Sequence, residues 1–130
     1  MATTERLEEG APTIEELEAK VQDRPDALEP LRALGWDLYG YERFDEAVDV
    51  LQGARERFPD DAETCYALGL TLKKVGKENE ARQAFQSALD ILKTKPGEIR
   101  FDMMRKLAGG QINLLDHGSW DINELQFDER

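Results

Sequence analysis

Apolar residues recur along this 130-residue chain in two copies that are offset by 34 residues. Gly35 corresponds to Gly69 in this way, and Leu51 corresponds to Phe85. The first copy comprises Leu34, Gly35, Leu38, Ala47, Leu51 and Ala54. The second copy comprises Leu68, Gly69, Leu72, Ala81, Phe85 and Ala88. Within each copy the residues fall on two short stretches with the spacing of one face of an α-helix. A fixed period of this length indicates a stack of helical hairpins.

The pattern resembles the tetratricopeptide repeat family, whose unit carries Leu-Gly on its first helix and Ala-x-x-x-Phe-x-x-Ala on its second. The resemblance implies an all-α fold: antiparallel helical hairpins stacked as a short right-handed superhelix, with capping helices at both ends. It also implies a protein-binding surface without naming the partner. The chain departs from the family where Leu31 and Cys65 replace its first-helix Trp, and where Lys93 replaces the closing Pro of the second unit.

The two glycines inside the helical pattern need a physical reason, because Gly in a helix costs about 1 kcal/mol relative to Ala. We expect Gly35 and Gly69 to mark close approaches of paired helices, where any side chain would push the partner away. Leu51 and Phe85 are then expected to fill the space between the helices.

Helix start and stop signals divide the chain. Thr13 with Glu16 and Asp60 with Glu63 have capping-box spacing and predict helix starts. Gly109-Gly110 interrupts the last helical pattern, and Gly118 suits a helix end. We predict a disordered N-terminus at 1–11, a capping helix in 12–27, repeat units at 28–61 and 62–95, a capping helix in 96–118 and an acidic-aromatic tail at 119–130.

The net charge of −11 is concentrated at the two ends of the chain. Residues 1–29 carry −6 (nine acids, three bases) and residues 116–130 carry −4 (five acids, one base). This acidity disfavours nucleic acid and anionic membranes as partners. No run approaches the roughly 20 apolar residues of a membrane helix. The single Cys65 excludes an internal disulfide and favours a cytoplasmic location.

The sequence offers little for catalysis. His117, the only histidine, stands beside Gly118 at a predicted helix end, where a positive charge is favourable. Cys65 falls on a core position, so we expect an inert thiol. Metal-ligand pairs and phosphate-binding glycine loops are missing from the sequence. We therefore predict a non-enzyme without metal or cofactor.

The outward positions of the first helix in each unit predict a binding site. Counting from the Leu-Gly pairs, these positions include Glu29 and Glu63 together with a set of aromatic, apolar and basic residues. The predicted groove residues are Arg32, Trp36, Tyr39, Tyr66, Leu70, Lys73 and Lys74. Aromatic residues and Arg are enriched at binding hot spots. We expect a concave groove that binds a peptide or helix of a partner protein, with apolar anchors and acidic character. The competing interpretation is that Trp36 and Tyr39 pack within the protein.

The tail leaves alternatives open. Its large apolar residues Trp120, Ile122, Leu125 and Phe127 stand among acids. One interpretation is a short helix packed on the preceding capping helix. The other is a detachable segment that fills the groove of its own chain or of a twin. The latter would make the protein a self-associating structural module, a homodimer or larger homo-oligomer, instead of an adaptor.

Overall fold

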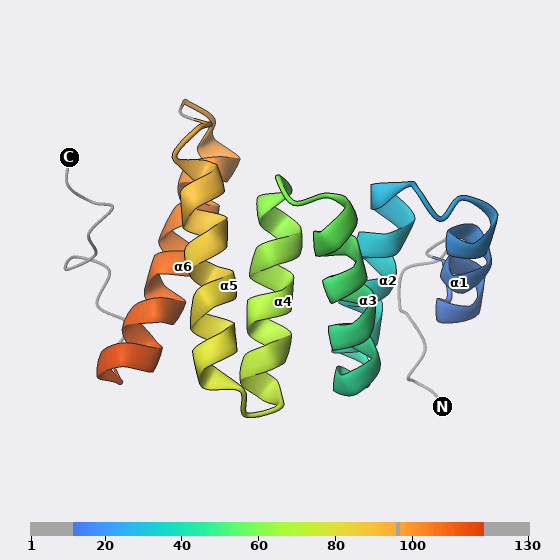
Figure 1. Ribbon diagram of the computed structural model, residues 1–130, viewed down its shortest axis with the longest axis horizontal. Helices are drawn as coiled ribbons and strands as arrows, with labels where there is room; N and C mark the ends of the chain where they lie inside the picture. The colour runs from blue at the N-terminus through green and yellow to red at the C-terminus, as the bar shows by residue number, and fades with distance from the viewer. Residues whose placement is uncertain (1–11, 96, 119–130) are drawn as a thin grey trace.

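A computed structural model describes residues 12–95 and 97–118, and these residues form an all-α fold (Figure 1). Two segments lie outside the described residues. They are residues 1–11, for which disorder was predicted, and the tail at 119–130 with Trp120, Ile122, Leu125 and Phe127. The six helices of the described part are α1 (Ile14–Asp23), α2 (Leu28–Gly40), α3 (Phe44–Arg57), α4 (Ala62–Lys74), α5 (Glu78–Leu92) and α6 (Ile99–His117).

The helices stand side by side in a row, with α1 and α6 at opposite ends (Figure 1). Each helix packs on the next one along the chain, and α2 also contacts α4. The sequence repeat is reproduced in the structure, because α2 and α4 begin at Leu28 and Ala62, and α3 and α5 begin at Phe44 and Glu78. The predicted stack of helical hairpins is therefore confirmed.

The two helical glycines are the points of closest approach within each hairpin. A Cβ at Gly35 would lie 2.4 Å from Cδ2 of Leu51, and a Cβ at Gly69 would lie 2.5 Å from Cε1 of Phe85. Both distances are far below van der Waals contact, and Leu51 and Phe85 are fully buried. The prediction that these glycines admit the partner helix is confirmed.

Both hairpins turn through the same hydrogen-bonded motif. Arg43 N donates to Leu38 O at 2.8 Å and Glu42 N donates to Tyr39 O at 3.0 Å. The second turn repeats the pair from Lys77 N to Leu72 O at 2.9 Å and from Gly76 N to Lys73 O at 3.1 Å. These are the two bonds of a Schellman motif, whose penultimate residue is left-handed. Gly76 takes that conformation at φ 86°, but in the first turn Glu42 takes it at φ 64°.

Helix starts are capped in two ways. Thr13 and Glu16 form the predicted reciprocal capping box at the start of α1. At α4 the prediction of Asp60 with Glu63 is wrong, because Asp61 is the cap and accepts from Thr64 N at 3.0 Å. Asp61 has the extended backbone of a cap residue, so the helix begins one residue later than the spacing suggested. Glu63 is thereby free to contact α2.

The last helix, α6, continues through Gly109 and Gly110 without a break. Both glycines are buried, together with Ala108, so the stretch that interrupts the apolar pattern is a small-residue face that packs inward. Gly118 ends the helix in the left-handed conformation at φ 72°, as its position predicted. The two glycines therefore interrupt the apolar pattern without breaking α6.

Candidate functional site

The predicted groove residues come from the two first helices of the hairpins: Arg32, Trp36 and Tyr39 from α2, and Tyr66, Leu70, Lys73 and Lys74 from α4. We call this set the α2–α4 face. The two helices contact each other directly, so residues far apart in the sequence meet across the face.

Trp36 and Arg32 are held by acidic residues of the neighbouring hairpin. Trp36 Nε1 donates to Glu63 Oε2 at 2.8 Å. Arg32 Nη1 donates to both carboxylate oxygens of Asp61 at 2.9 Å, and its Nε lies 3.5 Å from Glu63 Oε1. One carboxylate of α4 therefore orients both an aromatic ring and a guanidinium of α2. The charge of Arg32 is already balanced inside the protein.

Asp61 combines helix capping with this ion pair. Its carboxylate accepts from Thr64 N and from Thr64 Oγ1, the latter at 2.6 Å, as well as from Arg32. Burial by itself raises the pKa of Asp61, but the hydrogen bonds from Thr64 and Arg32 outweigh burial and hold the pKa below its usual value. The ionised carboxylate of Asp61 thus links α2 to the start of α4.

Tyr39 extends the aromatic surface of α2. Its ring packs edge-on against Trp36 at 6.0 Å between centroids and against Phe44 at 5.5 Å. All three rings are partly exposed, so they form a continuous aromatic strip from α2 to the start of α3. Edge-to-face packing of this kind fixes ring orientation.

Tyr66 lies deeper than its neighbours on the face. Its exposed fraction is 9%, and its ring stacks on Phe85 at 5.6 Å in the core. Burial raises the pKa of Tyr66, although a hydrogen bond with Gln111 of α6 acts in the opposite direction. Tyr66 therefore belongs to the core more than to the surface of the face.

The remaining residues of the face lie toward the C-terminal end of α4. Leu70 is half-buried and packs against the core. Lys73 Nζ donates to Gln111 Oε1 at 2.8 Å, which links α4 to α6. Lys74 is exposed. The structure therefore brings Gln111 into the candidate site, a residue that periodicity alone did not connect to it.

A hollow of about 350 Å³ adjoins the α2–α4 face where α2, α4 and α6 begin. Its apolar lining comes from Leu28, Ala62, Phe101 and Met104, and its charged lining from Glu29, Arg32, Asp60, Asp61, Glu63, Lys95 and Arg100. The α6 residues could not be assigned to the site from the repeat pattern, because their match to the repeat is poor. A hollow of this size with a mixed apolar and charged lining suits one large side chain of a peptide.

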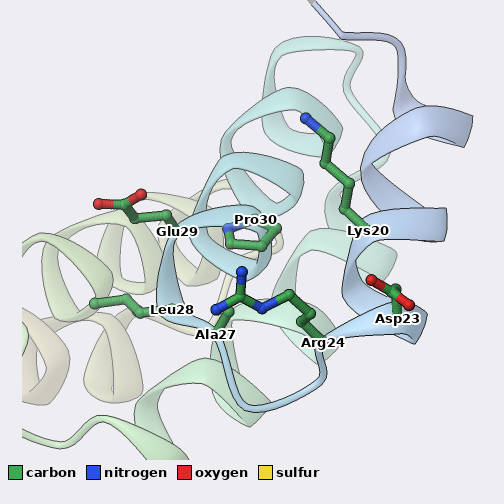
Figure 2. A pocket seen from close by; sticks show the side chains of 7 residues that line it. All are labelled: Lys20, Asp23, Arg24, Ala27, Leu28, Glu29 and Pro30. Atoms are coloured by element: carbon green, nitrogen blue, oxygen red, sulfur yellow. The ribbon is translucent and has the colours of Figure 1, made fainter.

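A larger hollow of about 620 Å³ lies between the end of α1 and the start of α2 (Figure 2). Its lining residues are Lys20, Asp23, Arg24, Ala27, Leu28, Glu29 and Pro30. Figure 2 shows Leu28 and Glu29 pointing to the side of α2 opposite Lys20 and Asp23. Since its polar groups do not converge on a common point, we assign this hollow no binding role.

The residues considered for chemistry occupy structural positions. Cys65 is 1% exposed, and burial raises the pKa of its thiol, so the sulfur is both protonated and covered. His117 is the last residue of α6. Within residues 12–95 and 97–118, no cluster of three or more His, Cys, Asp or Glu side chains could hold a metal ion. In the same part of the chain, no helix is long and apolar enough to cross a membrane.

The fold is that of a helical-repeat solenoid, as comparison with solved structures shows. The chain is similar to a crystal structure of MamA, with a TM-score of 0.59 and 29% identity. Two further MamA structures, designated MSR-1 and AMB-1, give TM-scores of 0.55 and 0.56, each at 25% identity. In all three, the match covers 79% of this chain but only 58%, 57% and 55% of the MamA chains. No family model matches the sequence, and no curated protein matches it.

Proposed function

We propose that this protein is a non-catalytic, cytoplasmic interaction module that binds a peptide or helix of a partner protein on the α2–α4 face. The observation that carries the proposal is the half-buried pair Trp36 and Tyr39, whose rings meet edge to face. Glu63 fixes the indole through its 2.8 Å hydrogen bond. The similarity to MamA supports a repeat scaffold and leaves the partner open.

Preorganisation supports this role. Binding normally requires side chains at the interface to lose rotamer freedom, at about 0.5–1.5 kcal/mol for each one ordered. Trp36 and Tyr39 are already constrained by Glu63 and Phe44. Rings held in this way can bury a partner's apolar side chain without that ordering cost. Rigid aromatic residues are therefore suited to be the anchors of the interface.

The charges of the face suggest the character and direction of the ligand. Arg32 is neutralised by Asp61 and Glu63, so the acidic side chains of the ligand would meet Lys73 and Lys74 at the other end of α4. The hollow beside the helix starts would receive an apolar side chain of the same ligand. The proposed ligand thus has an apolar anchor at one end and acids at the other.

Peptide selection tests the proposal. Binders are selected from a random library of 16-residue peptides on the wild-type protein, and their affinities for the variants are then measured. Trp36→Ala removes the central ring and should weaken the selected peptides at least about 10-fold, the loss expected for a hot-spot residue. Arg82→Ala, which removes the exposed Arg82–Asp116 ion pair between α5 and α6, is the matched control and should bind normally.

Thermal unfolding of the same variants separates binding from stability. Because Trp36 is half-buried, its replacement should lower the melting temperature only moderately. Equal binding by the wild type and Trp36→Ala would contradict the proposed site. A melting temperature that collapses in Trp36→Ala would instead place the indole in the core, as the competing interpretation holds.

A further inference from the structure

An apolar stripe runs along the outer side of α6. Ile99, Met103 and Leu107 are 77%, 60% and 43% exposed, and they are the large hydrophobic residues that the described part of the chain leaves exposed. They stand four residues apart, so they follow one line along the helix. Because α5 packs on α6 through its buried residues, no other helix of residues 12–95 and 97–118 covers this stripe.

Scattered exposed hydrophobic residues need no explanation, but a contiguous stripe marks an interaction surface. Large apolar side chains of α1 to α5 are buried or only partly exposed, so the stripe on α6 stands apart from them. Ile99, Met103 and Leu107 are not among the residues that line the hollow of the proposed partner site, although Arg100 beside the stripe is.

We propose that residues 119–130 of the same chain dock on this stripe and cover Ile99, Met103 and Leu107. The segment brings the matching chemistry, because Trp120, Ile122, Leu125 and Phe127 are its large apolar residues. Pairing them with the stripe would remove both apolar sets from water at once.

The starting point and length of the segment fit the stripe. Residue 119 follows Gly118, whose left-handed conformation turns the chain out of the axis of α6. At 1.5 Å per helical residue, Leu107 lies about 16 Å and Ile99 about 28 Å back along the helix. Twelve residues reach at most about 40 Å when extended. The segment can therefore return along the whole stripe.

Charge complementarity favours the same arrangement. The segment carries the acids Asp121, Glu124, Asp128 and Glu129. The exposed bases Arg100 and Lys106 stand three residues before and after Met103, on either side of the stripe. Arg100 also contacts Glu98 at 3.2 Å, and Asp102 is paired with Arg105, so Lys106 is the main basic contact that remains for the segment.

The chain's own segment is favoured over that of a second copy by proximity. A tethered segment faces its site at an effective concentration in the millimolar range, well above the concentration at which a twin would compete in dilute solution. Docking on α6 would also leave the α2–α4 face open for a partner. The proposal therefore does not depend on the partner-binding function, and either can fail alone.

Paramagnetic relaxation in the full chain tests this docking. A nitroxide is attached through Asp128→Cys, since Cys65 is buried and escapes labelling. The Ile and Met methyl groups carry ¹³C. If the segment docks, the methyl signals of Ile99 and Met103 should lose most of their intensity. Ile14 on α1, at the opposite end of the row (Figure 1), should keep its signal. Unchanged signals at Ile99 and Met103 would overturn the proposal.

Two further samples make the result specific. In a mixture of spin-labelled, isotope-free chains with isotope-labelled, spin-free chains, Ile99 should stay sharp. Broadening there would show that a second copy covers the stripe, against the proposal. Met103→Glu should restore the Ile99 signal several-fold, whereas Gln83→Glu, which adds the same charge at an exposed site on α5, should not. Persistent broadening in Met103→Glu would place the segment elsewhere.

Discussion

The hairpins α2–α3 and α4–α5 follow the same sequence register but are buried to different extents. Helix α4 buries nine of its 13 residues, whereas α2 buries four of 13. Helix α4 lies between α3 and α5 and also contacts α2. Equivalent positions consequently differ in environment: Arg32 is part-buried in an ion pair on α2, while Tyr66 stacks on Phe85 in the core. Position within the stack, not the repeat pattern, decides how deeply each copy's equivalent residues are buried.

The largest difference between the hairpins is expected at their central side chains. Phe85→Ala should lower the free energy of unfolding by about 4 kcal/mol, and Leu51→Ala by about 3 kcal/mol, within the range for large-to-small core changes. The loss of stability is expected to be larger for Phe85→Ala, because the ring of Phe85 also packs on Tyr66. Urea unfolding followed by circular dichroism measures both values. Equal losses would mean that the two hairpins are energetically equivalent.

The glycine contacts provide a sharper test. A methyl group at Gly69 would overlap the rigid ring of Phe85, so Gly69→Ala should destabilise the protein by about 1–2 kcal/mol, after allowing for the better helix propensity of Ala. In the Phe85→Ala background the overlap is gone, and the same change should stabilise by about 1 kcal/mol. A double-mutant cycle measures this reversal of sign. Additive effects would show that Gly69 has no steric role.

The energy contributed by the cap of the first helix should also differ between the two hairpins. Asp61→Ala removes the cap of α4 and should cost about 1–2 kcal/mol. The equivalent Ala27 makes no side-chain cap, and the residue three positions later is Pro30, which has no N–H to donate. Ala27→Asp should therefore gain only a few tenths of a kcal/mol. Thermal unfolding of the two variants measures both effects. If Ala27→Asp stabilised the protein by as much as Asp61→Ala destabilises it, the predicted asymmetry would be wrong.

The same carboxylate should give the second hairpin an acid sensitivity. The folded protein holds the pKa of Asp61 below its usual value, so the ionised form stabilises the fold above the unfolded pKa of about 4. That contribution is lost as the pH falls below about 4 and through the folded pKa. Asp61→Asn should flatten this part of the stability profile, measured by urea unfolding between pH 5 and pH 2. If Asp61→Asn lost stability toward low pH as steeply as the wild type, other groups would be responsible for that loss.

The two turns are expected to respond with opposite signs. Glu42 occupies the left-handed position that Gly76 occupies in the second hairpin, at a cost of about 1 kcal/mol for a residue with a side chain. Glu42→Gly should therefore stabilise the protein by up to about 1 kcal/mol. Gly76→Ala should destabilise it by about 1–2 kcal/mol. A Glu42→Gly variant that is less stable than the wild type would indicate that the Glu42 side chain contributes more than the strain costs.

Much of the fold could be predicted because its signals are local. The Leu-Gly pairs, the helix end at Gly118 and the Thr13–Glu16 spacing are signals of this kind, and the structure confirms each of them. The failure at α4 arose where two local signals competed. Asp60 and Asp61 are adjacent capping residues, and only the backbone conformation selects Asp61. Gly109 and Gly110 interrupt the apolar pattern of the last helix, yet α6 runs through them because they pack inward.

The candidate site was predicted in part. Trp36 and Tyr39 were assigned to the α2–α4 face from helical spacing, and the structure places their rings together on α2. Their partners could not be predicted, because Glu63 and Gln111 come from other helices and reach the site only after the hairpins stack. Binding by these residues remains a prediction.

The sequence by itself determined the hairpins, their register and the helix contacts at Gly35 and Gly69, since helical periodicity and steric fit repeat within each unit. The tertiary structure decided which charges are already paired, that the ring of Tyr66 enters the core and that the described helices leave an apolar stripe of α6 exposed. These properties depend on which helix lies next to which. A side chain's partner across a helix interface is set by packing geometry, which the spacing of residues along one helix does not contain.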